Sequence, residues 1–152
     1  MDTRTAPARP NFILLLFLVA ALLTGCGSAK VDELRTYRDA MTGFFDRLAD
    51  YDRAIRGIDP EEEGASQEFL SLIDSVADEC VQIAAIDTPE EYLPVQESSI
   101  RLSRDMQLSR DAFHAAFEGE SFNAEAFSEA MENYEKANQG LQEMIRILHS
   151  EG

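Results

Sequence analysis

The feature that most constrains the fold is a run of apolar residues at alternating steps of three and four between residues 34 and 58. This spacing lays one apolar stripe along a helix, which must then be covered by neighbouring helices. Gly57 and the pair Asp59-Pro60 end the pattern, because proline cannot continue the helical hydrogen-bond ladder. The stripe contains Leu34, Tyr37, Met41, Phe44, Leu48, Tyr51, Ile55 and Ile58, and Phe45 widens it.

Three later segments repeat this periodicity, and no segment has the sustained apolar–polar alternation of a strand. The sequence therefore predicts an all-α chain, folded as an antiparallel up-down four-helix bundle with short connections. The residues expected to face inward are Phe69, Leu72, Ile73, Val76, Cys80, Ile83 and Ile86 in the second helix, Tyr92, Val95, Leu102, Met106, Phe113 and Phe117 in the third, and Phe127, Met131, Tyr134, Leu141, Ile145 and Leu148 in the fourth.

The start of the third helix has two interpretations. Thr88 is suited to cap a helix, Pro89 suits a first helical position, and Glu91 stands where a capping box places its acid. Pro94, however, disfavours helical geometry at Leu93. Either the helix starts near Pro94 with residues 89–93 as a separate turn, or one helix bends there and has an irregular first turn. We favour the second interpretation.

Small and charged residues indicate which helices are neighbours. Serines are frequent in the third helix, where small side chains let another helix approach closely; they are Ser98, Ser99, Ser103 and Ser109. Arginines concentrate in the first and third helices, whereas unpaired acids concentrate in the second and fourth. In an up-down bundle this arrangement favours ion pairs between adjacent helices, each worth only ~0–1 kcal/mol when exposed.

The amino-terminal segment has the organisation of a secretory signal peptide. Arg4 and Arg9 precede an unbroken apolar run from Phe12 to Leu23. The run is shorter than the ~20 apolar residues of a membrane-spanning helix. A basic start, a short apolar core and small residues at the exit are typical of a cleaved signal.

The exit of this segment, Leu23-Thr24-Gly25-Cys26, resembles the lipobox of bacterial lipoproteins. The resemblance covers residues 1–26 and implies that Cys26 is lipidated and becomes the first mature residue. It divides the chain into a signal peptide (1–25), a lipidated cysteine with a short tether (26–30) and a helical domain (31–152). Acyl chains on Cys26 would hold the domain at a membrane, outside the cytoplasm. By the same resemblance, Gly27 favours the outer membrane in a two-membrane cell, and the cell membrane is the alternative.

Composition excludes some classes of partner. The formal net charge of −16 repels phosphate backbones, so nucleic-acid binding is not expected. It also disfavours adhesion to anionic lipid heads, which leaves membrane attachment to the lipid. With Cys26 modified, Cys80 has no cysteine partner for a disulfide and is expected to be a small core residue.

Candidate sites are few. Carboxylates in and near the first connection, Asp59, Glu61, Glu62 and Glu63 with Glu118 and Glu120, could contact Ca²⁺ or a basic partner. Glutamates also simply complement a helix dipole, and the spacing is not that of an EF-hand. His114, one turn after Asp111, and His149 are expected to be ordinary core or surface histidines, so neither a metal nor another cofactor is predicted. No catalytic serine motif occurs, and an enzyme is not expected.

The sequence thus favours a lipid-anchored, extracytoplasmic binding or accessory protein that offers a contact surface to another envelope protein or a small ligand. A structural spacer and a Ca²⁺ binder are alternatives. The aromatic and methionine-rich stripes could also enclose a small apolar ligand, although core packing accounts for the same residues.

Overall fold

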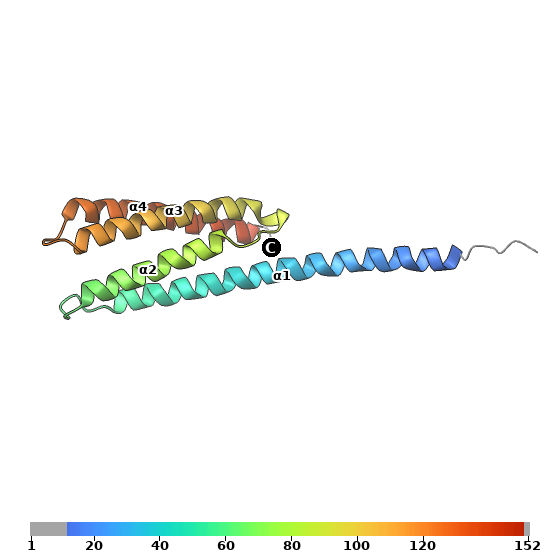
Figure 1. The fold of residues 1–152 in the computed structure, drawn as a ribbon, viewed down its shortest axis with the longest axis horizontal. Helices are drawn as coiled ribbons and strands as arrows, with labels where there is room; N and C mark the ends of the chain where they lie inside the picture. Colours follow the sequence, from blue (N-terminus) through green and yellow to red (C-terminus); the bar gives the residue numbers. More distant parts are fainter. Residues whose placement is uncertain (1–11, 151–152) are drawn as a thin grey trace, which may run out of the picture. The chain divides into compact units, whose positions relative to one another are not determined.

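The structure is a computed structural model that describes the backbone of residues 12–150 and the side chains of residues 29–150. The described part is all-α and contains four α-helices, one short 3-10 helix and no strand, which confirms the predicted fold class. The elements are α1 (Phe12–Gly57), α2 (Ala65–Ala84), η1 (Glu90–Tyr92), α3 (Leu93–Phe117) and α4 (Ala124–Ser150) (Figure 1).

The chain forms two compact units that meet within α1, between Thr36 and Tyr37. In the first unit, the Arg35 side chain pairs with Asp32 at 2.8 Å, and the Thr36 hydroxyl donates to the Asp32 carbonyl. Within the described residues, every buried side chain belongs to the second unit, Tyr37–Gly152. The second unit therefore holds the whole described core.

The predicted stripe of the first helix is confirmed in its first half and changes character in its second. Tyr37, Met41 and Phe44 are buried. Leu48 and Ile55, one and three turns further on, are only half-buried. The helix ends at Gly57, as predicted. The middle of α1 therefore contributes to the core, whereas the apolar side chains near the carboxyl end of α1 stay partly accessible.

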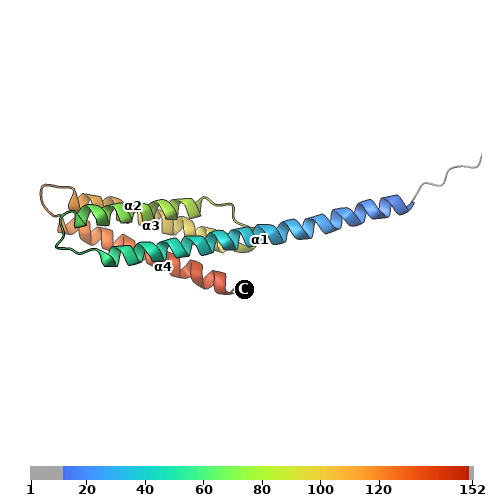
Figure 2. The same ribbon diagram turned by 90° about the horizontal axis from the view of Figure 1, so that it is seen from below.

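α3 packs most extensively against α4 and next against α2 (Figures 1 and 2). Small residues explain the close approach to α4. The Ser109 hydroxyl donates to the Ala130 carbonyl at 2.9 Å, and a Cβ at Gly140 would lie 3.5 Å from the Cβ of Leu102. The four serines predicted to permit close packing of α3 are all buried.

This close contact corrects the predicted inward face of α4. Met131 and Ile145 were expected in the core, but they are 46% and 36% exposed. The buried positions of α4 are instead Ala130, Asn133, Ala137 and Met144. Because small side chains allow the shortest distance between two helices, Ala130 of α4 lies against Ser109 of α3, whereas Met131 and Ile145 are exposed. Among the larger residues of α4, Phe127 contacts Phe113 and Phe117 of α3.

The start of α3 matches the interpretation that we did not favour. Glu90–Tyr92 form a separate 3-10 turn, and the α-helix begins at Leu93, with Pro94 in its first turn. Thr88 does not cap it; its hydroxyl donates to the carbonyl of Ile86. Pro94 lacks an N–H, so it is tolerated only where that donor would have no helical partner.

Residues around η1 join it to α1. The ring of Tyr92 stacks on Tyr37 with centroids 5.0 Å apart, and Arg38 Nε donates to Tyr92 Oη at 2.7 Å.

Ion pairs between helices follow the predicted distribution of charge at two helix–helix interfaces. Arg47 meets Glu79 of α2 at 2.8 Å, and Arg101 meets Glu143 of α4 at 3.0 Å.

Candidate functional site

The second unit contains a cleft of about 560 Å³ whose lining comes from all four α-helices. α1 and α4 supply most of the lining, and α2 and α3 supply a largely buried floor. The lining residues are Phe45, Leu48, Ala49, Asp52, Ile55 and Arg56 from α1, Val76 and Cys80 from α2, Leu102 and Met106 from α3, and Tyr134, Ala137, Asn138, Leu141 and Ile145 from α4.

The cleft follows from how α4 is oriented. Ala130 and Gly140 of α4 lie against α3, and Tyr134, Leu141 and Ile145 line the cleft together with Ala137. The half-buried residues Leu48 and Ile55 of α1 line the cleft as well. The apolar side chains that sequence periodicity assigns to a closed core therefore border an accessible space. Its volume lies within the range of ~300–1,000 Å³ typical of small-ligand sites.

Three of the polar residues that line the cleft, Asp52, Arg56 and Tyr134, lie near one another, and a fourth, Asn138, lies one turn further along α4. Arg56 Nε and Asp52 Oδ2 form an ion pair at 2.9 Å on α1, and both side chains are more than half exposed. The Tyr134 hydroxyl of α4 interacts electrostatically with both. Burial is the main cause that raises the pKa of Tyr134, and the negative charge of Asp52 adds to it. The phenol is therefore neutral near pH 7 and able to donate a hydrogen bond.

Cys80 lies in the floor of the cleft and is 1% exposed. Burial raises the pKa of its thiol to about 12, with a smaller contribution from the charge of Glu79. The thiolate is the reactive form of cysteine, so this thiol is unreactive at neutral pH. The prediction that Cys80 is a small core residue is confirmed.

His114 is held between two carboxylates. Its Nδ1 lies 2.7 Å from Glu118 Oε1, and its Nε2 lies 2.9 Å from Asp74 Oδ1 of α2. Asp111, which lies one turn before His114, pairs with Arg110. The hydrogen bond to Glu118 is the main cause that raises the His114 pKa above its usual value, burial opposes it, and Asp74 contributes in the same direction. His114 thus links α2 to α3.

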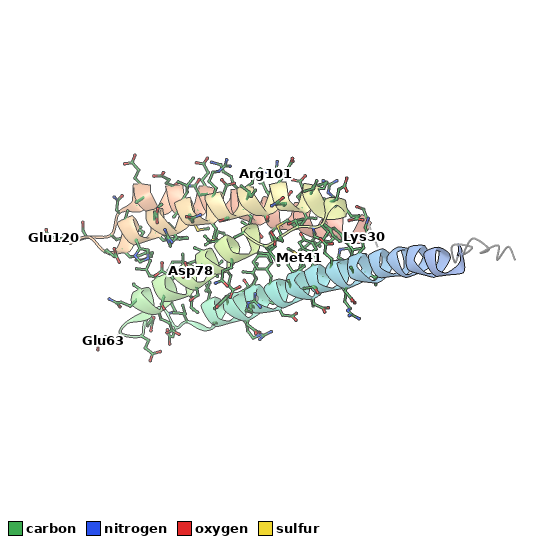
Figure 3. All side chains as sticks on the ribbon, turned by 45° about the vertical axis from the view of Figure 1, so that its right-hand side comes forward. Lys30, Met41, Glu63, Asp78, Arg101 and Glu120 are labelled. Atoms are coloured by element: carbon green, nitrogen blue, oxygen red, sulfur yellow. The ribbon has the colours of Figure 1, made fainter. Side chains whose placement is uncertain are left out.

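The acidic residues that were predicted to contact Ca²⁺ or a basic partner lie in two separate connections at one end of the second unit. Figure 3 shows Glu63 and Glu120 at the tips of separate turns. Asp59 Oδ1 accepts from the backbone N–H of Glu61 at 3.0 Å, which organises the first turn. All six predicted residues, Asp59, Glu61, Glu62, Glu63, Glu118 and Glu120, are exposed. Among the residues that the structure describes, no group of three or more side chains is arranged to hold a metal ion. Contact with a basic partner stays a prediction.

The lipobox residues Leu23, Thr24, Gly25 and Cys26 lie before residue 29, outside the described side chains, so their role also stays a prediction. Within the described residues, no helix has an apolar stretch long enough to cross a membrane.

A second depression of about 410 Å³ lies over α3 and the end of α2, and Ile100 and Leu108 of α3 are about half exposed there. Comparison with family models, curated proteins and solved structures gives no match for this chain.

Proposed function

We propose that this chain is a lipid-anchored envelope protein that binds a small, mainly apolar ligand in the cleft beside α1 and α4. In this proposal the domain is an antiparallel up-down four-helix bundle. It serves as a binding or accessory protein that holds its ligand near a membrane surface, for its own use or for an envelope partner.

The observation that carries the proposal is the cleft of about 560 Å³ with a predominantly apolar lining. An apolar molecule that enters such a space leaves water, which contributes roughly 25 cal/mol for each Å² of apolar surface that it buries. A few polar groups at one place, namely Asp52, Arg56 and Tyr134, would orient the molecule, as in other small-ligand sites.

The anchoring part of the proposal is supported by the amino-terminal sequence. Arg4 and Arg9, the apolar run Phe12–Leu23 and the step Leu23-Thr24-Gly25-Cys26 occur in the order of a lipoprotein signal. Cleavage before Cys26 and acylation of its thiol would place the domain outside the cytoplasm, on the cell membrane or the outer membrane. Two or more acyl chains suffice for stable attachment.

Binding is favoured over catalysis because of the groups that border the cleft. Asp52 and Arg56 neutralise each other, and the raised pKa values of Tyr134 and Cys80 keep both side chains protonated at neutral pH. A protonated phenol and a protonated thiol are poor nucleophiles. The arrangement therefore provides affinity and orientation without an activated group.

The test uses a chain that begins at Ala29, because this chain retains the whole described core. Nile red, an uncharged apolar dye, is titrated and its fluorescence followed. Ala49→Phe places a ring into the cleft from an exposed position of α1. Ala54→Phe makes the same change on α1 at an exposed position that does not line the cleft, and it is the matched control.

We expect wild type and Ala54→Phe to bind the dye with affinities within twofold of each other. Ala49→Phe should weaken binding at least tenfold, while circular dichroism shows the same helix content in all three. Equal binding by the two variants, or no saturable binding by wild type, contradicts the proposed site.

A further inference from the structure

We infer that the ligand is a linear amphiphile with a single alkyl chain and a zwitterionic head, and that its head lies beside Asp52, Arg56 and Tyr134. This inference rests on the proposed function, since it concerns what the same cleft selects. The shape of the cleft, the position of its polar groups and their charges support it.

The cleft is elongated. Its lining residues run from Phe45 to Arg56 on α1 and from Tyr134 to Ile145 on α4, which is twelve residues, or eleven helical steps, on each helix. At 1.5 Å per residue this corresponds to roughly 16 Å along either helix. A space of about 560 Å³ drawn out over that length suits a chain-like molecule better than a compact ring system.

Polarity changes along the cleft. The Tyr134 hydroxyl interacts with Asp52 and Arg56, so the start of the α4 lining lies beside the end of the α1 lining. With α4 antiparallel to α1, Leu141 and Ile145 then lie toward Phe45 and Leu48, where the lining is hydrocarbon. A molecule that matches both regions has a polar head and an apolar tail.

The charges at the polar region favour a head that carries both signs. Arg56 and Asp52 lie 2.9 Å apart, and the Arg56 side chain is 78% exposed and accessible to a ligand. A guanidinium pairs well with a phosphate oxygen, and a carboxylate pairs with an ammonium group. A purely anionic head would find one attractive group and the repulsion of a chain whose formal net charge is −16. A zwitterionic head satisfies Asp52 and Arg56 together.

The experiment uses the full chain in nanodiscs and three photoreactive probes. Each probe has the same twelve-carbon chain with a terminal diazirine, and the heads are phosphocholine, trimethylammonium and carboxylate. After irradiation, mass spectrometry measures labelling of the peptides that contain Leu141 and Ile145, normalised to labelling of the nanodisc scaffold protein. Asp52→Asn and Arg56→Gln alter the polar region. Arg53→Gln is the matched control, because Arg53 pairs with Asp50 at 2.8 Å and neither lines the cleft.

We expect the phosphocholine probe to label these α4 peptides at least threefold more than the carboxylate probe. Arg56→Gln and Asp52→Asn should each lower phosphocholine labelling at least threefold, and Arg53→Gln should leave it unchanged. Equal labelling by the three probes, or an equal loss in Arg53→Gln, overturns the inference while leaving the cleft as a binding site. If no probe labels these peptides, the proposed function fails together with the inference.

Discussion

Ser109 Oγ donates a hydrogen bond of 2.9 Å to the backbone carbonyl of Ala130, and this bond joins α3 to α4 at a point where both residues are fully buried. A serine side chain is short enough to reach a neighbouring helix only when the two backbones lie close together. The contact therefore marks the tight pairing of α3 and α4, and Tyr134, Leu141 and Ile145 of α4 line the cleft.

Replacing Ser109 tests this pairing. Ser109→Ala removes one buried hydrogen bond and should lower the free energy of unfolding by about 1 kcal/mol. Ser109→Leu forces bulk between the helices and should cost about 1–3 kcal/mol or more. Urea denaturation measures both changes. Ser75→Ala is the control, since Ser75 donates only to Ser71 within α2. A Ser109→Leu protein as stable as wild type would contradict close packing at this position.

Gly140 provides a second test of the same interface, with the opposite sign. Its added Cβ would lie 3.5 Å from Leu102 Cβ, which is an ordinary van der Waals contact. Alanine also favours a helix interior over glycine by roughly 0.5–1 kcal/mol. We therefore predict that Gly140→Ala raises the thermal unfolding midpoint, whereas Gly140→Leu lowers it. If both substitutions destabilise, the two backbones approach more closely than described.

His114 should make stability fall as the pH rises above about 6.5. Because its pKa is higher in the folded chain, folding favours the protonated form. The stabilisation is complete below the unfolded pKa of about 6.5 and is lost as pH rises through the folded value. The urea midpoint should therefore fall as the pH rises above about 6.5.

His114→Gln should flatten this part of the pH profile. His149→Gln is the matched control, because His149 contacts only the Ile145 carbonyl on its own helix. Denaturation series at pH 6, 7 and 8 make the comparison. A profile that keeps its slope in His114→Gln, or loses it in His149→Gln, assigns the dependence to other groups.

Cys26 is predicted to carry the membrane anchor. Cys26→Ser should abolish incorporation of radiolabelled palmitate into the full chain expressed in bacteria, because serine lacks the thiol that is acylated. It should also leave the signal peptide uncleaved. Cys80→Ser, which alters a buried thiol, should keep both label and cleavage. Label that persists in Cys26→Ser would contradict the anchor.

Periodicity alone predicted the helical class and most of the core. Tyr37, Met41 and Phe44 repeat at steps that only a helix places on one face, and all three are buried. The serines of α3 also predicted that another helix packs closely against α3, since small side chains allow two helix backbones to approach each other.

Periodicity did not predict the buried face of α4 or the position of the cleft. Periodicity selected Met131 and Ile145 because they are large and apolar, but the shorter side chains of Ala130 and Ala137 decide which face packs against α3. Whether an apolar residue then fills a core or borders a cleft depends on the distance between α1 and α4, which no residue spacing reports. Periodicity also did not decide where α3 starts. The helix begins at Leu93 because the restriction imposed by Pro94 outweighs the capping pattern at Thr88.

The central claim is that an alkyl chain occupies the cleft, and intermolecular nuclear Overhauser effects test it most directly. The chain from Ala29 is labelled with ¹³C at its methyl groups and titrated with dodecylphosphocholine below the concentration at which micelles form. The account predicts contacts from the alkyl protons to the methyls of Leu48, Ile55, Leu141 and Ile145. Contacts confined to Ile100 and Leu108, or none when the amphiphile is in excess, would contradict it.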